Sequence, residues 1–352
     1  MTRPSRVLIV FCFTLLGSAA LLVGAEAAYR FRTARQQGVQ VRFYRHARLQ
    51  RAMVRDTDYG GVVHINREGF RGTDLETAKA PGTTRIMAVG PSTTFDPCAV
   101  RDSETWPERL EYWLGELVPN RRFEVINAGV PGLPMLGHII RLQTELHAFD
   151  PDVIVVYAGH GIVSSADAYV NAEAASRTPD AAPIVTPLDR WLRRHSRLYE
   201  RVLPAREPAE VAVELDDRQW ELAVDNAARR FERDLTSFSV IARSLGAEVV
   251  FAEINRVTGS RTPAQFTAPE REAWRMFATP PEIVLAGYRR FNIIWQTVAA
   301  STDATFVPAD SIAITGRDNF CDHDPIHFST AGSEAMGRRM AHQLLGHGVV
   351  AP

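Results

Sequence analysis

Ser92 lies in the segment AVGPSTTFD, directly after an apolar run, RIMAV, that is typical of a buried strand. A serine on a turn at a strand end can attack a carbonyl carbon when a base lies within reach of its hydroxyl. The segment CDHDPIHFSTAG supplies a candidate base, His327, and Asp324 stands three residues before it. At that spacing in a turn, a carboxylate can orient the same imidazole. These residue types predict nucleophilic acyl chemistry.

Two further strand ends carry small residues that an oxyanion site needs. Gly129 lies in NAGVPG after the second apolar run, and Gly161 lies in YAGHGI after the third. A glycine lets its backbone N–H approach a substrate closely. We therefore expect the Gly129 N–H to donate a hydrogen bond to a developing oxyanion.

The ordered set GPSTTFD, NAGVPG, VVYAGHG and DPIHFSTAG resembles the four conserved blocks of the SGNH/GDSL hydrolases. VHINREGFRG before the first block and ETWPERLE after it resemble the membrane-anchored bacterial branch. The resemblance implies a flavodoxin-like sheet and ester or acyl hydrolysis without a metal or other cofactor. It implies Ser92 as nucleophile, His327 as base and Asp324 as the residue that orients the base. The N–H groups of Ser92 and Gly129 are the implied oxyanion donors.

Two positions depart from the family pattern. Pro91 stands where the first block usually has aspartate or glycine, and this change leaves the Ser92 N–H intact. Gly161 stands where the third block has an asparagine whose side chain donates to the oxyanion. The loss of one such donor costs about 10²–10³ in rate.

Three explanations of Gly161 stay open. Another side chain replaces the asparagine, or the Gly161 N–H or a water donates instead, or the protein has given up efficient hydrolysis and binds or slowly transfers acyl groups. Besides residues of an insertion, the candidate replacements are His160, Ser164 and Ser165.

Asp322, His323 and Asp324 crowd together as metal ligands sometimes do. The sequence offers no spaced partner cluster elsewhere, so we expect no metal and interpret Asp324 as the partner of His327.

The elements that must position these residues alternate between strands and helices. Helical patterns, among them one over residues 103–118 with Ser103 as the expected N-cap, separate five short and mostly continuous apolar runs. Such runs are typical of strands buried on both faces of a parallel sheet, and the alternation predicts a three-layer α/β/α sandwich. The expected strands are residues 85–90, 123–128, 152–158, 247–254 and 304–309.

The N-terminal segment Val7 to Ala25 carries no charge and follows Arg3 and Arg6. Its length suits a transmembrane helix, and a basic leader before a single span usually leaves the bulk of the chain outside. We therefore expect an exported domain, tethered to the bacterial inner membrane and facing the periplasmic or extracellular side, or secreted if AEA at residues 25–27 is cleaved.

The predicted organisation has three parts: a signal-anchor or transmembrane segment over residues 1–27, a tether with a small β element over 28–80, and the SGNH-hydrolase-like α/β domain over 81–352. Residues 59–72 are expected to form a short strand with turns, a lid or hairpin against the main domain. Proline-rich insertions at 164–215 and 256–280 interrupt the α/β pattern.

Cys98 lies six residues after Ser92, and Cys321 lies six residues before His327. In an oxidising compartment these cysteines can pair and tie the two loops together. The alternative is two unrelated buried thiols.

The formal net charge is −1, and no long basic run occurs, so a nucleic acid is not an expected partner. The expected partners are the membrane, through the N-terminal helix, and an acylated small molecule or glycan as substrate. We predict a tethered esterase that acts on O-acyl groups of envelope or extracellular glycans. The alternatives are a glycan-binding protein that uses the same cleft and an O-acyltransferase.

Overall fold

The computed structural model describes residues 14, 17, 18, 20–28, 41, 43, 44, 52–59, 61–158, 196, 199, 217–274 and 281–351. The chain divides into two compact units, one of Met1–Gln40 with Asn171–Val213 and the other of Val41–Val170 with Glu214–Pro352. In the described part of the first unit, residues 20–28 are helical, and the Ser196 hydroxyl donates to the Glu26 carboxylate (2.8 Å). The second unit holds the sheet and the candidate site.

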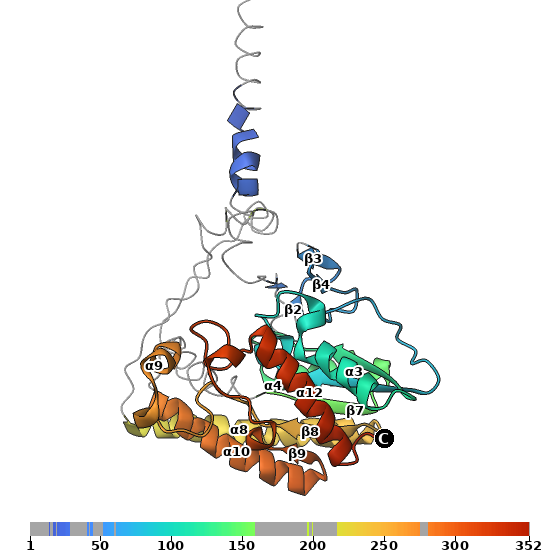
Figure 1. Cartoon of the computed structure of the whole chain (residues 1–352), viewed down its shortest axis with the longest axis vertical. Helices are drawn as coiled ribbons and strands as arrows, with labels where there is room; N and C mark the ends of the chain where they lie inside the picture. Colours follow the sequence, from blue (N-terminus) through green and yellow to red (C-terminus); the bar gives the residue numbers. More distant parts are fainter. Residues whose placement is uncertain are drawn as a thin grey trace, which may run out of the picture. The chain divides into compact units, whose positions relative to one another are not determined.

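The second unit alternates strands and helices in the order that the sequence predicts (Figure 1). Its strands are β1 (Phe43–Tyr44), β2 (Ala52–Met53), β3 (Thr57–Tyr59), β4 (Val63–Ile65), β5 (Thr83–Val89), β6 (Arg122–Asn127), β7 (Val153–Val156), β8 (Glu248–Ala252) and β9 (Thr305–Val307). Its α-helices are α2 (Ser92–Phe95), α3 (Trp106–Leu117), α4 (Met135–Thr144), α8 (Asp217–Ser244), α9 (Ala268–Trp274), α10 (Pro281–Thr302), α11 (Ala309–Ile312) and α12 (Thr330–Gly346). Short 3₁₀ turns occur at Asp102–Glu104, Leu146–Phe149, Pro263–Gln265 and Arg317–Asn319.

The central sheet has five parallel strands in the order β6-β5-β7-β8-β9. This is the flavodoxin-like order, with the switch point between β5 and its two neighbours β6 and β7. All five predicted strands are present, and the α/β fold class is confirmed. In such sheets the usual place for a site is the crevice at the switch point, just beyond the carboxyl ends of the strands.

Successive side chains of a strand point to opposite faces of the sheet. Both faces of this sheet are buried, because helices cover each of them. Ile86 and Ala88 of β5 belong to the core under α3 and α12, whereas Met87 and Val89 belong to the core under α4, α8 and α10. Figure 1 shows α3 and α12 side by side, and the two helices pack closely. Helices on both faces of the sheet make the predicted three layers.

The expected β element before the main domain is a hairpin of β3 and β4, paired antiparallel. Single bridges from Ile65 to Arg71 and from Arg71 to Asn127 join the hairpin to the end of β6. The Arg71 backbone is therefore held at the carboxyl edge of the sheet, where the candidate site lies.

The helix expected from residue 103 begins at Trp106 and has Thr105 as its N-cap, while Ser103 lies in the preceding 3₁₀ turn, so the prediction of Ser103 as the cap is wrong. No helix within the described residues is long and apolar enough to cross a bilayer.

The predicted insertions are only partly visible. Residues 256–274 hold two short helical segments, Pro263–Gln265 and α9, and residues 275–280 lie outside the described residues. Most of the insertion predicted at 164–215 lies outside them as well.

Candidate active site

The turn that carries Ser92 is a close-packed corner between β5 and α2. A Cβ on Gly90 would lie 2.3 Å from both Thr94 Oγ1 and the Tyr157 carbonyl oxygen, so only glycine fits there. The Thr94 hydroxyl donates to that same carbonyl (2.8 Å) and ties α2 to the end of β7. Pro91 accepts hydrogen bonds from the N–H groups of Thr94 and Phe95 (3.1 and 3.0 Å). The corner therefore fixes Ser92 as the first residue of α2.

Ser92, His327 and Asp324 form one continuous hydrogen-bonded chain. His327 Nε2 lies 2.8 Å from Ser92 Oγ, and His327 Nδ1 lies 2.6 Å from Asp324 Oδ2. The other carboxylate oxygen of Asp324 accepts the N–H groups of Ile326 and His327 (2.9 and 2.8 Å). The structure thus brings together the three side chains that the sequence predicts, from segments 235 residues apart.

The surroundings of Asp324 keep its carboxylate ionised. Burial by itself raises the pKa of this carboxyl, but the hydrogen bond to His327, the charge of a protonated His327 and two backbone N–H donors outweigh it and hold the pKa below its usual value. The side chains of His327 and Asp324 are only 11% and 15% exposed. An ionised aspartate at Nδ1 fixes the tautomer in which Nε2 can accept a proton from Ser92.

The structure describes both backbone amides that the sequence predicts as oxyanion donors, those of Ser92 and Gly129. Among the described residues the Ser92 N–H has no hydrogen-bond acceptor, as expected at the start of a helix. The Gly129 N–H donates to Asn127 Oδ1 (3.1 Å), so in this structure the predicted donor is engaged in its own turn. A Cβ on Gly129 would lie 2.3 Å from the Phe95 nitrogen, which shows that this glycine lets the β6 loop pack against α2.

Outside the described residues lie Gly161 and the candidate replacements for the third oxyanion donor, His160, Ser164 and Ser165. Their roles therefore stay predictions.

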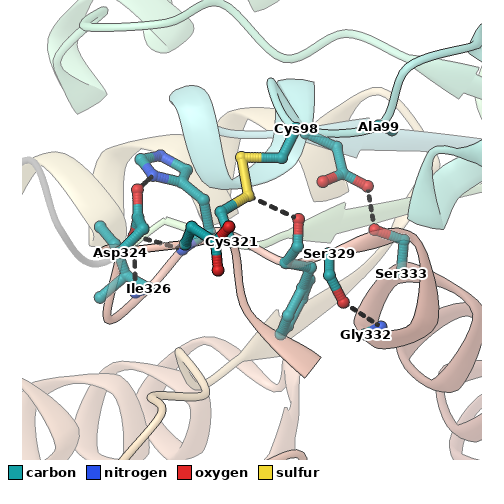
Figure 2. The surroundings of a disulfide bond; sticks show 12 residues. Cys98, Ala99, Cys321, Asp324, Ile326, Ser329, Gly332 and Ser333 are labelled. Atoms are coloured by element: carbon teal, nitrogen blue, oxygen red, sulfur yellow. Dashed lines mark hydrogen bonds and ion pairs between the residues drawn. A yellow bond between two sulfur atoms is a disulfide. The ribbon is translucent and has the colours of Figure 1, made fainter. Parts of the chain in front are cut away.

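A disulfide joins Cys98 and Cys321, with a Cα–Cα distance of 6.4 Å, and this confirms the predicted pairing. Figure 2 shows the bridge with Asp324 on one side of Cys321 and Ser333 on the other. The Cys321 N–H also donates to the His327 carbonyl (3.0 Å). The bridge therefore links the segment after Ser92 directly to the loop that carries the base.

The acidic run beside the base is exposed. The Asp322 side chain is fully exposed and lies 3.6 Å from Arg317, and His323 is exposed as well. Asp324 is turned away from that run toward His327. Within the described residues no group of three or more possible metal ligands occurs.

Two buried residues that the sequence motifs do not single out, Asp96 and Arg71, hold the segment that carries Ser92. Asp96 Oδ2 accepts hydrogen bonds from the Trp106 N–H (2.9 Å) and the Ser333 hydroxyl (2.6 Å). The Arg71 guanidinium donates to the carbonyl oxygens of Phe95, Asp96 and Ala99 and pairs with Asp102 (2.9 Å). Both residues lie inside or beside the quoted motifs, but their partners are distant in the sequence.

No protein-family model matches the sequence, and no curated protein matches it. Solved structures similar to this chain include TesA, with 16% identity, a TM-score of 0.45, and coverage of 76% of this chain and 99% of that chain. An acetyl xylan esterase, AlAXEase, has 12% identity and a TM-score of 0.44 over 74% of this chain and 100% of its own.

A putative lipolytic protein of the G-D-S-L family from Desulfitobacterium hafniense DCB-2 has 13% identity and a TM-score of 0.41 over 74% of this chain and 98% of its own. It carries the name of the family that the four sequence blocks resemble. Because these TM-scores lie below 0.5, the chemistry proposed next rests on the side-chain geometry of this chain.

Proposed function

We propose that this chain is a serine ester hydrolase of the SGNH/GDSL type. The observation that supports it most is the hydrogen-bonded chain from Ser92 through His327 to Asp324. A serine, an imidazole and a carboxylate in this order are the parts needed for nucleophilic acyl transfer, whatever fold carries them.

The reaction has two halves. Ser92 Oγ attacks the ester carbonyl carbon while its proton passes to His327 Nε2, and the Ser92 N–H donates to the developing oxyanion. The bond from the carbonyl carbon to the alcohol oxygen then breaks, and the alcohol leaves with the proton from His327. In the second half a water molecule gives its proton to His327, attacks the acyl-enzyme and releases the acid, and Ser92 regains its proton.

We propose O-acyl groups of envelope or extracellular glycans as the substrate and an exported, membrane-tethered form as the state of the enzyme in the cell. The uncharged segment Val7 to Ala25 supports the tether. Within it, the apolar side chains of Leu21, Leu22 and Val23 are 76%, 66% and 70% exposed. The disulfide supports export, because such bridges persist in oxidising compartments.

The test is hydrolysis of p-nitrophenyl acetate and of an O-acetylated glycan by the full chain. Wild type is expected to release acid from both, and Ser92→Ala is expected to lose at least about 10⁴ in kcat, as serine nucleophile variants of other hydrolases do. Ser103→Ala changes an exposed serine outside the site and serves as the control.

The products separate the alternatives. Free acetate in the absence of a sugar acceptor supports hydrolysis, whereas acetate that appears only on an added acceptor sugar would identify a transferase. If the wild type cleaves neither ester, the hydrolase proposal is wrong. Glycan binding that is equal in wild type and Ser92→Ala would then identify a binding protein.

A further inference from the structure

Asp96 follows α2 directly and adopts a left-handed backbone conformation with φ 64°. Glycine is the usual residue in that conformation, because a Cβ makes it costly. Asp96 is also 1% exposed, so its carboxylate is removed from water. Both the burial of the carboxylate and the left-handed backbone cost free energy of folding, so stability alone does not account for an aspartate at this position. The contacts of its carboxylate indicate its role.

The carboxylate joins three segments at one point. Asp96 Oδ2 accepts the N–H of Trp106, the first residue of α3, and the hydroxyl of Ser333, in the first turn of α12 (2.9 and 2.6 Å). The Asp96 N–H donates to the Ser92 carbonyl (2.8 Å), so the residue is bonded to the nucleophile's own backbone. One oxygen thus links α2 to both helices that cover this face of the sheet.

The link to Ser333 matters because α12 follows the base. The helix is capped by Ser329, two residues after His327, and the Ser333 N–H donates to the Ser329 carbonyl (2.9 Å). Ser333 is fully buried, which leaves the side chain no alternative partner in water. The position of α12 relative to α2 therefore sets where the loop that carries His327 enters α12.

The backbone of Asp96 is fixed from the opposite side. Arg71 Nη1 donates to the Asp96 and Phe95 carbonyls (2.6 and 3.2 Å), and the guanidinium carbon lies 4.9 Å from the centre of the Phe95 ring. Arg71 contacts the carbonyl and not the carboxylate, so the two charges hold different atoms of the same turn. This leaves the carboxylate directed at α3 and α12.

We propose that Asp96 is a positioning residue for the reaction, whose carboxylate holds α2 against α12 so that Ser92 Oγ and His327 Nε2 are aligned before substrate binds. The inference rests on the proposed function. Together with the Cys98–Cys321 bridge, the Asp96–Ser333 hydrogen bond gives the nucleophile and base segments a second tie across the same junction. Figure 2 shows the bridge beside the loop that carries Asp324, and Ser333 in the helix that follows.

The experiment compares Asp96→Gly, Asp96→Asn and Ser333→Ala with wild type by the kcat and KM for p-nitrophenyl acetate and by the rate and final stoichiometry of fluorophosphonate labelling. Glycine accepts the left-handed backbone but removes the carboxylate, and a lost hydrogen bond to a charged group corresponds to roughly a tenfold to a hundredfold loss in rate. Asp96→Gly is expected to lose that much in kcat and labelling rate, with KM and the final stoichiometry unchanged. Asp96→Asn keeps an acceptor oxygen and is expected to retain most of the rate.

Ser333→Ala removes the hydrogen bond to α12 but leaves Asp96 and its bond to Trp106 in place, so it tests the positioning role even if Asp96→Gly does not fold. Like Asp96→Gly, it is expected to lower the labelling rate. The matched control is Asp303→Gly, because Asp303 is also left-handed (φ 55°) but has a 91% exposed side chain that pairs with Arg243. This control is expected to label at the wild-type rate.

The outcomes separate the two proposals. If wild type is not labelled, the proposed function and the positioning role are both refuted. If wild type is labelled and folded Asp96→Gly or Ser333→Ala reacts at the wild-type rate, the positioning role is refuted and the proposed function stands. A fall in stoichiometry without a fall in the rate of the reacting fraction would also refute it, because that is the result of partial unfolding alone.

Discussion

Removal of the Cys98–Cys321 disulfide is expected to destabilise the protein and to slow the chemistry. The bridge closes a loop across a sequence separation of 223 residues. In the chain-entropy description of cross-links, a loop of that size restricts the unfolded chain by about 5 kcal/mol at 25 °C. The Cys98→Ser/Cys321→Ser variant should therefore lose about 5 kcal/mol in free energy of unfolding.

The bridge also touches the site, so the loss of activity is expected in molecules that remain folded. Cys98 lies six residues after Ser92, and the Cys321 N–H is bonded to the His327 carbonyl (3.0 Å). Without the covalent link, the nucleophile and base loops depend on hydrogen bonds alone. A lower rate of ester hydrolysis per folded molecule follows.

The assay is urea unfolding of the full chain, followed by tryptophan fluorescence, for wild type with and without dithiothreitol and for the double variant. Reduced wild type and the variant should unfold at the same lower urea concentration, and dithiothreitol should not change the variant further. Coincident curves for oxidised and reduced wild type, with equal activity, would refute the reasoning.

Three further predictions concern residues around Ser92, each measured by urea unfolding. Gly129→Ala places a Cβ 2.3 Å from the Phe95 nitrogen and should cost roughly 1–3 kcal/mol and slow labelling of Ser92, whereas Gly115→Ala meets nothing within 4 Å and should be neutral or stabilising; equal effects would contradict the packing role. Arg71→Met removes the buried guanidinium that donates to Asp102 and to three carbonyl oxygens and should cost roughly 3–5 kcal/mol, against about 0–1 kcal/mol for Arg67→Met, whose pair with Asp74 is exposed; a small loss for Arg71→Met would be inconsistent with its contacts. Burial raises the pKa of Asp96 from 3.8 to about 6, so the folded state binds more protons than the unfolded state between these values and Asp96 lowers stability as the pH rises through that window. Wild type should therefore lose about 3 kcal/mol in free energy of unfolding relative to Asp96→Asn between pH 3 and pH 7. A difference between the two proteins that does not change with pH would show that Asp96 titrates normally.

The sheet and the residues of the hydrogen-bonded chain Ser92–His327–Asp324 could be predicted because their sequence signals are local. Strands buried on both faces are continuous apolar runs, and all five runs became strands within a few residues of the expected bounds. Ser92 follows one such strand, and Asp324 and His327 share one turn, so each motif can be recognised within a few residues of the sequence.

The supports of the site could not be predicted because their partners come from elsewhere in the chain. Ser103 is a good local cap, yet α3 begins at Trp106, whose N–H is satisfied by Asp96 from ten residues upstream. The bond from Asp96 to Ser333 crosses 237 residues, and no pattern within either motif indicates it. The free N–H expected of Gly129 is engaged by Asn127, because the short turn brings the amide to its own asparagine side chain.

The most direct measurement of the central claim is the site of covalent reaction. The full chain is treated with a fluorophosphonate, and the adduct is located by intact mass and peptide mapping. A single adduct on Ser92 in wild type, none in Ser92→Ala and a strongly reduced rate in His327→Ala are expected from the 2.8 Å contact between Ser92 Oγ and His327 Nε2. The absence of an adduct in wild type, or an adduct of equal yield in Ser92→Ala, would contradict the assignment of Ser92 as the nucleophile.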